Sequence, residues 1–242
     1  MRRITDPTGR FPERLYYDND ELDNLAEQLI NEFIIKLYGK LVIPVPTDDL
    51  IKLIERDTSD LDSYADLSVE EEGVQGVTSF IYGSKPKVRI AASLWEDRSG
   101  HRLRTTLMHE YGHVKLHTPL FTSKGAQTAL DLFPSCCESQ KCHRDTIIHE
   151  HQTQQGGDWL EWQAGYMSGA LLMPSNHVCA MLDQIGRRNG NSGSAETGSP
   201  YALALINTIA GAYDVSKDAA RIRLIQLGRL TKGLYQNQES LF

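Results

Sequence analysis

The stretch TTLMHEYGHVKLH, residues 105–117, decides how this chain is expected to fold. It contains the pattern H-E-x-x-H, in which His109 and His113 are four residues apart. Apolar residues around it recur at helical spacing, which predicts a helix from about His101 to His117, and Pro119 should end this helix. Residues four apart lie on one face of a helix, one turn from each other. The two imidazoles can therefore bind one metal ion together.

The glutamate between these histidines suits a different role. Glu110 projects about 100° round the helix from His109, so it lies near the ion without being forced to bind it. A carboxylate in that place can take a proton from a water molecule that a zinc ion has made acidic. The pattern therefore predicts a catalytic zinc site with Glu110 as general base, although a helix with two solvated or core histidines would show the same spacing. A further donor should stabilise the oxyanion, and His117 and Tyr111 lie nearby in the sequence.

A catalytic zinc site needs three protein ligands and one open position. A third histidine on the pattern H-x-x-G-x-x-H is disfavoured, because His117 follows His113 on the same helix without a glycine turn. The segment DWLEWQAGYMSGALLMP predicts a second helix that is capped by Asp158, and Glu161 lies in its first turn. Small residues would let this helix approach the first one closely: Ala164, Gly165, Ser168 and Gly169. We therefore expect Glu161 to be the third ligand, while a glutamate that only favours the helix dipole would look the same.

The segment between the two helices, residues 118–157, shows no sustained periodicity and is expected to be an irregular insertion. It is rich in possible metal ligands, namely Cys136, Cys137, Cys142, His143, His149 and His151. Thiolates form closed structural zinc sites, so we do not expect them on the catalytic ion. Two interpretations remain open: a reduced surface loop, or a second, structural site made by Cys137, Cys142 and one of the three histidines.

Four segments of the chain resemble the ImmA/IrrE family of metallopeptidases. They are TTLMHEYGHVKLH, EWQAGYMSGALLMP, the preceding GVTSFIYGSKPKVRIAAS and the tail DVSKDAARIRLIQLG, and their order and spacing cover roughly residues 40–230. The resemblance implies that His109, His113 and Glu161 bind Zn²⁺ and that Glu110 is the catalytic glutamate. It also implies an intracellular protease whose protein substrate is a helix-turn-helix repressor or a similar regulator. The Cys/His insertion before Asp158 departs from the family pattern.

The predicted fold class is α+β, with a zincin-like core. A small antiparallel sheet or hairpin should pack on the HExxH helix, next to the second ligand helix and C-terminal helices. We expect a single metallopeptidase domain over residues 1–242: N-terminal helices and hairpin over about 1–100, the zinc-binding core over about 101–186, and a C-terminal helical segment over about 200–233. The other expected elements are helices from Leu22 to Leu37, from Asp48 to about Glu55, from Ser175 to about Gly186, from Tyr201 to Tyr213 and from Ser216 to Leu227, a loop up to Gly73, and strands from Val77 to Tyr82 and from Val88 to Ala92.

Composition limits the partners and the compartment. The net charge of −7 argues against a protein that coats nucleic-acid phosphates, so direct nucleic-acid binding is not expected. The helix-turn-helix-like tail with Arg221 and Arg223 is expected to serve packing. No apolar run matches a signal peptide or a membrane span, and four cysteines do not indicate a secreted disulfide framework, so a cytoplasmic location is expected. Much of the acidity lies between Asp48 and Glu72, on a solvated face that could meet a basic repressor.

Two other functions fit the same motifs. The protein could be a non-enzymatic, zinc-containing regulator that binds a repressor or DNA without hydrolysis. It could also be a zinc hydrolase that acts on other substrates than peptides. Glu110 disfavours the first alternative, because a binding module needs no base beside its metal.

Overall fold

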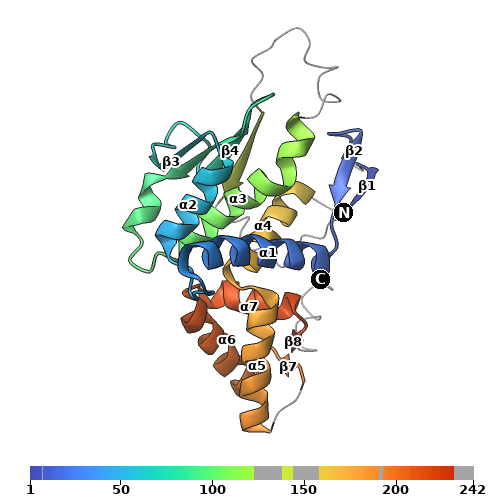
Figure 1. Ribbon diagram of the computed structural model, residues 1–242, viewed down its shortest axis with the longest axis vertical. Helices are drawn as coiled ribbons and strands as arrows, with labels where there is room; N and C mark the ends of the chain where they lie inside the picture. The colour runs from blue at the N-terminus through green and yellow to red at the C-terminus, as the bar shows by residue number, and fades with distance from the viewer. Residues whose placement is uncertain (7, 123–137, 144–157, 191–192, 232–242) are drawn as a thin grey trace, which may run out of the picture.

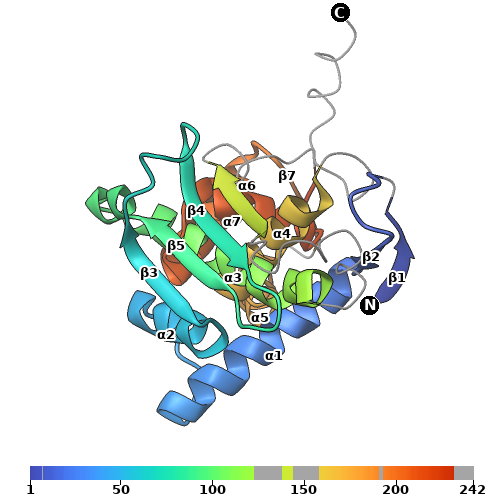
Figure 2. The same cartoon turned by 90° about the horizontal axis from the view of Figure 1, so that it is seen from above.

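The computed structural model describes residues 1–6, 8–122, 138–143, 158–190 and 193–231. Within this part of the chain the structure is mixed α+β, as predicted. A four-stranded sheet covers one side of the long helix α3 (His101–Thr122), and α4 (Trp159–Leu172) packs beside α3 (Figure 1, Figure 2). No helix among the described residues is long and apolar enough to cross a membrane.

The sheet combines predicted and unpredicted strands. Its strands are β3 (Asp60–Ala65), β4 (Val74–Phe80), β5 (Lys87–Ala91) and β6 (Glu138–His143). Their order is β3-β5-β4-β6, with β3 parallel to β5 and the other neighbours antiparallel. The predicted hairpin is confirmed as β4 and β5. The expected loop before Gly73 is wrong where β3 forms, and the expected irregular insertion is wrong where β6 forms.

Both unexpected strands carry weak sequence signals. β3 reads DLDSYA, and Ala65 is the one residue in it that is fully buried. β6 reads ESQKCH, and its buried residues Gln140 and Cys142 are neither β-branched nor aromatic. Alternation predicts a strand only where apolar residues mark one face. These two strands are stabilised by pairing with β5 and β4, which no local pattern reveals.

Helix α3 continues beyond the residue that was expected to end it. Pro119 lies inside α3, so the prediction of an end near His117 is wrong. Proline has no N–H to donate to the carbonyl four residues earlier, which normally weakens a helix. After Pro119, however, Leu120 and Phe121 are buried, and the Phe121 ring stacks on that of Phe80 with centroids 4.2 Å apart. This packing offsets the lost hydrogen bond.

Helix α4 begins where its capping residue predicts. The Asp158 side chain accepts a hydrogen bond from the backbone N–H of Leu160 at 3.0 Å. Eleven of the fourteen residues of this helix are buried because it lies between α3, α1 and α7, and its polar residues therefore face neighbours rather than water. Glu161 is one of these buried polar residues.

Small residues bring α3 and α4 close together, as expected. A Cβ atom added to Gly112 would lie 3.0 Å from the Cα and the carbonyl oxygen of Ala164, which are backbone atoms that cannot give way. Ser168 also donates a hydrogen bond to the carbonyl of Thr105 at 2.9 Å. A side chain at Gly169 would instead meet residues of α7. The close approach is therefore confirmed at Ala164 and Ser168, and these contacts fix where Glu161 lies.

The remaining elements surround this pair of helices. The helices are α1 (Asn19–Tyr38), α2 (Thr47–Asp57), the short helix η1 (Ala92–Glu96), α5 (Ser175–Asn189), α6 (Pro200–Tyr213) and α7 (Lys217–Gln226). Two further strand pairs form: β1 (Arg2–Thr5) pairs with β2 (Glu13–Tyr16), and β7 (Ala195–Glu196) pairs with β8 (Leu230–Thr231). The longer helices confirm the predictions to within a few residues. Figure 1 shows α5, α6 and α7 together at the end of the molecule away from the sheet.

In the helix-turn-helix-like tail, one of the two arginines, Arg223, has a packing role. Arg223 is buried, and its guanidinium lies 2.7 Å from the Asp23 carboxylate and donates to the carbonyl of Met173 at 3.0 Å. A side chain held in this way cannot reach a phosphate. Arg223 therefore joins α7 to α1 and to the end of α4.

Candidate metal centre

Three side chains from α3 and α4 converge at a buried point. The Glu161 carboxylate lies 3.0 Å from Nε2 of His109 and 3.1 Å from Nε2 of His113, and the two Nε2 atoms are 3.1 Å apart. Ligands that surround one ion tetrahedrally at about 2.0 Å lie about 3.3 Å from each other. The observed separations are close to this value. These three residues, which the sequence analysis selected, could therefore hold one metal ion.

A chain of hydrogen bonds orients the His113 ring through its Nδ1 atom, while its Nε2 atom faces the other two ligands. Nδ1 of His113 lies 2.9 Å from Nδ1 of His117, and Nε2 of His117 lies 3.1 Å from the side-chain oxygen of Gln163. The Gln163 amide then donates to the carbonyl of Leu15 in β2 at 2.8 Å. This last bond fixes the Gln163 oxygen as an acceptor, so His117 donates from Nε2 and accepts at Nδ1 from His113. His113 is thereby left with its Nε2 lone pair toward the metal position.

Burial and neighbouring charges set the protonation states at the centre. Burial, together with the neighbouring His113, holds the pKa of His117 well below its ordinary value, so His117 is neutral as the hydrogen-bond chain requires. Burial alone would raise the pKa of Glu161, but the imidazoles of His113 and His109 reverse the shift and hold it below its ordinary value. Burial raises the pKa of Glu110, which makes its carboxylate a stronger base.

Replacing Gln163 with leucine is expected to weaken metal binding by about 10–100-fold, the usual effect of losing an outer partner of a ligand. Leucine cannot accept the hydrogen bond from His117, so His113 loses its fixed orientation. The affinity would be measured by competition with a chromophoric chelator. The Gln28→Leu variant, on the exposed side of α1, is the matched control. An unchanged affinity in Gln163→Leu would show that the chain of hydrogen bonds does not position His113.

Strand β4 holds Glu110 beside the ligands. The Thr78 hydroxyl donates to Oε2 of Glu110 at 2.5 Å, while the buried Oε1 has no hydrogen-bond partner among the described residues. Gly76 leaves room for this carboxylate, because a Cβ atom there would overlap Oε1 and lie 2.8 Å from Cδ and Cγ. One oxygen of Glu110 is thus anchored and the other remains free.

The two residues near the motif that could have stabilised an oxyanion are used elsewhere in this conformation. The Tyr111 hydroxyl donates to the Asp57 carboxylate at 2.7 Å and accepts from Arg56 at 3.1 Å, so it faces α2. His117 lies behind His113, on the side away from Glu161. Sequence reasoning did not identify the positioning roles of His117 and Gln163. The E-x-Q-A pattern contains Gln163, but only the folded structure shows what it contacts.

Cys142 lies beside His109 and Glu110, a place that the sequence analysis did not predict for any cysteine. It is buried on β6 and forms a second group of possible ligands with His109 and Glu110, in which the donor atoms are within 4.8 Å of one another. The surface-loop interpretation is therefore wrong for Cys142, which is fully buried, whereas the separate structural site depends on residues outside the described part of the chain. Cys136, Cys137, His149 and His151 lie outside the described residues, and the side chain of His143 is not described. Cys142 arrives through the pairing of β6 with β4, where it lies opposite Gly76.

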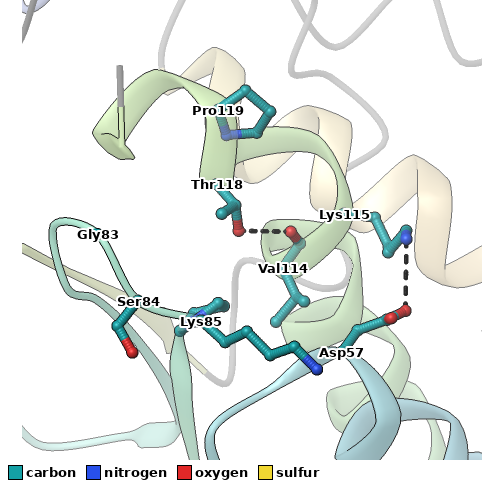
Figure 3. A pocket seen from close by; sticks show the side chains of 9 residues that line it. Asp57, Gly83, Ser84, Lys85, Val114, Lys115, Thr118 and Pro119 are labelled. Atoms are coloured by element: carbon teal, nitrogen blue, oxygen red, sulfur yellow. Dashed lines mark hydrogen bonds and ion pairs between the residues drawn. The ribbon is translucent and has the colours of Figure 1, made fainter. Parts of the chain in front are cut away.

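The centre is closed to solvent. His109, Glu110 and His113 have no exposed surface, and Glu161 is 8% exposed. An open hollow of 530 Å³ lies nearby, between the β4–β5 turn and the second half of α3 (Figure 3). It is lined by Asp57, Gly83, Ser84, Lys85, Pro86, Val114, Lys115, Thr118 and Pro119. None of the metal-site residues lines this hollow, so it gives no access to the centre.

The described residues thus define a mixed α+β protein with a buried histidine–glutamate centre that could hold a metal ion. Searches with the chain against protein-family models, curated proteins and solved structures found no match. The chemistry of this centre and the sequence motifs around it are therefore the basis on which a function can be proposed.

Proposed function

We propose that this protein is a zinc-dependent endopeptidase that cleaves a regulatory protein, with a helix-turn-helix repressor as the substrate. One observation carries the proposal: a buried carboxylate with a free oxygen, Glu110, lies beside a buried His109–His113–Glu161 ligand set. Two histidines and one glutamate are a ligand set of hydrolytic zinc sites, whereas structural zinc sites use four protein ligands. A metal-binding module without catalysis would not need Glu110.

The donor atoms favour zinc. Imidazole nitrogens and a carboxylate oxygen in a tetrahedral arrangement suit this ion. The proposal that the core is zincin-like depends on zinc being the bound ion. When bound, zinc supplies an acidic water molecule and a Lewis acid that polarises the scissile carbonyl. Glu110 takes the proton at Oε1, since Thr78 holds the other oxygen, and delivers it to the leaving amine.

The proposed substrate follows from the resemblance to the ImmA/IrrE family. A scissile bond must enter the site in an extended conformation, so it cannot stay inside a packed helix of the repressor during cleavage. Specificity should then depend on docking away from the cut. Several carboxylates between Asp48 and Glu72 are exposed and could meet a basic partner: Asp48, Glu55, Asp60, Asp62, Asp66, Glu71 and Glu72. Some carboxylates in that stretch are paired within the protein: Glu70 with Arg89 at 2.6 Å, Glu71 with Lys141 at 2.9 Å and Asp60 with Lys87 at 4.0 Å.

The test is incubation of the zinc-loaded protein with a co-purifying or neighbouring-gene regulator, with and without a chelator, followed by mass spectrometry of the fragments. We expect a single cut that needs both the metal and Glu110. A stable complex that is never cut while zinc remains bound would favour the non-enzymatic regulator. Cleavage of non-peptide esters alone would favour the broader class of zinc hydrolases.

Replacing Gly76 with alanine is expected to reduce cleavage by about 10²-fold, the loss typical of an ångström-scale misplacement of a catalytic group. The new Cβ atom would push aside the end of the Glu110 side chain, which is flexible, so fold and metal content should persist. Cleavage rate and zinc content would be measured together. Gly211→Ala on α6 is the control, since a Cβ there meets no atom within 4 Å. Full activity in Gly76→Ala would show that the position of Glu110 is not critical.

A further inference from the structure

Strand β6 occupies the edge of β4 that lies next to Glu110. Its register places Cys142 opposite Gly76, Lys141 opposite Val77 and Gln140 opposite Thr78. Two of these β4 residues, Gly76 and Thr78, accommodate and hold the Glu110 carboxylate. Figure 2 shows the four strands side by side over α3, and β6 is the outermost strand next to β4. Without β6, β4 would be an open edge that an extended peptide could join through backbone hydrogen bonds.

Side chains fasten β6 in this position. Gln140 and Cys142 are buried on the face toward α3, whereas Ser139 is exposed. Lys141 points the other way and forms ion pairs with Glu71 at 2.9 Å and with Glu70 at 3.3 Å. The Ser139 hydroxyl also lies 3.1 Å from that of Ser79. β6 is thus held by backbone pairing, by an ion-pair clamp, and by Cys142 at the centre.

We propose that Cys142 is a ligand of the metal in the resting protein and that β6 is the strand that delivers it. The inference takes one element from the proposed function, namely that a zinc ion occupies the His109–His113–Glu161 set, and it does not depend on the peptidase activity. The thiol lies in the group with His109 and Glu110, so it approaches the ion from the side on which Glu110 would meet a water molecule. Cys142 shares His109 with the His109–His113–Glu161 set but is not in one group with His113 and Glu161, so a closing movement of Cys142 is needed to complete four protein ligands, the number found in closed zinc sites.

Coordination by Cys142 keeps the enzyme inactive. Binding would break the S–H bond and form the metal–sulfur bond, and the thiol proton would be released to solvent as the ion enters the centre. With Cys142 bound, the position for water is filled. The full burial of His109, Glu110 and His113 agrees with such a closed state. Activity then requires β6 to leave β4, which frees the strand edge and the fourth position together.

The first experiment detects the sulfur ligand without any assay of activity. Zinc-loaded wild-type protein is expected to show a Zn–S distance of about 2.3 Å in X-ray absorption. The Co²⁺-substituted protein should show a thiolate-to-metal charge-transfer band that is lost in Cys142→Ser and kept in Cys179→Ser. Absence of the Zn–S distance, or a band that survives in Cys142→Ser, would overturn the inference. The absorption measurement needs no variant, so a poorly folded Cys142→Ser would not leave the question open.

The second experiment tests the closure by loosening the clamp. Lys141→Glu places a like charge beside Glu70 and Glu71 and should detach β6, so cleavage of the regulator should rise several-fold, as it should in Cys142→Ser. Lys87→Glu on β5, whose lysine pairs with Asp60 at 4.0 Å, is the matched control and should not raise it. Equal cleavage rates in all variants would overturn the inference that β6 and Cys142 keep the enzyme inactive. If no variant cleaves any protein although the sulfur ligand is present, the proposed peptidase function fails while the ligand assignment stands.

Discussion

Glu110→Gln is expected to retain the metal and the fold and to lose about 10²–10⁴-fold in peptide-bond hydrolysis, the usual contribution of a general base. The amide keeps the shape of the side chain and can still accept the hydrogen bond from Thr78. It cannot take a proton, so water is no longer activated by this side chain. Cleavage would be followed by mass spectrometry of fragments, and zinc content by elemental analysis.

The same variant should be at least as stable as the wild-type protein. Burial raises the pKa of Glu110, which means that the ionised carboxylate is costly to bury, and a neutral amide avoids this cost. The Glu55→Gln change on the exposed side of α2 is the matched control for both measurements. Normal turnover by Glu110→Gln on a verified substrate would exclude the proposed mechanism. Loss of zinc from this variant would instead indicate that Glu110 is itself a ligand, together with His109 and Cys142.

The helical part of the centre could be predicted because its signals are local. The H-E-x-x-H spacing sets two imidazoles on one turn of α3, and the capping residue Asp158 sets the start of α4. Small residues then predict that the two helices approach, and the structure brings Glu161 within 3.1 Å of both histidines. Each of these steps depends on residues that are close in the sequence or on one helix face.

The strand side of the centre could not be predicted, because it depends on pairing between distant segments. Gly76 and Cys142 face each other across β4 and β6, although 66 positions separate them in the numbering. The ESQKCH segment has no apolar face to mark it as a strand, so Cys142 looked like part of a loop. The outer hydrogen-bond chain is similar, since Gln163 reaches back to Leu15 near the start of the chain. Spacing along the chain contains no information about such contacts.

Glu161→Ala is expected to lower metal affinity by more than the about 10–100-fold expected for Gln163→Leu, because it removes a ligand rather than the partner of one. Among the described residues, the Glu161 carboxylate is the one that contacts both imidazoles, at 3.0 and 3.1 Å, and it is nearly fully buried. Without it, two buried histidines must share the ion with fewer donors. Metal content after dialysis and affinity by chelator competition would measure the loss.

Thermal unfolding gives an independent measure of the same loss. Because the ion binds the folded state and not the unfolded chain, a chelator should lower the melting temperature of the wild-type protein and have much less effect on Glu161→Ala. Glu161→Gln keeps the volume of the side chain and should separate the lost charge from lost packing. Glu55→Ala on the exposed face of α2 should behave as the wild-type protein does.

The combination of Glu161→Ala with Cys142→Ser distinguishes the two ligand groups. If Cys142 is a resting ligand, Glu161→Ala still offers His109, His113 and a thiolate, so some metal should remain and should show a sulfur signal. The double variant should then retain none, because two imidazoles alone make a weak site for zinc. Full occupancy in Glu161→Ala that does not depend on Cys142 would show that Glu161 is not a ligand. The ion would then have to be sought at His109 and Glu110, and the proposed role of Glu110 as a base would fall with it.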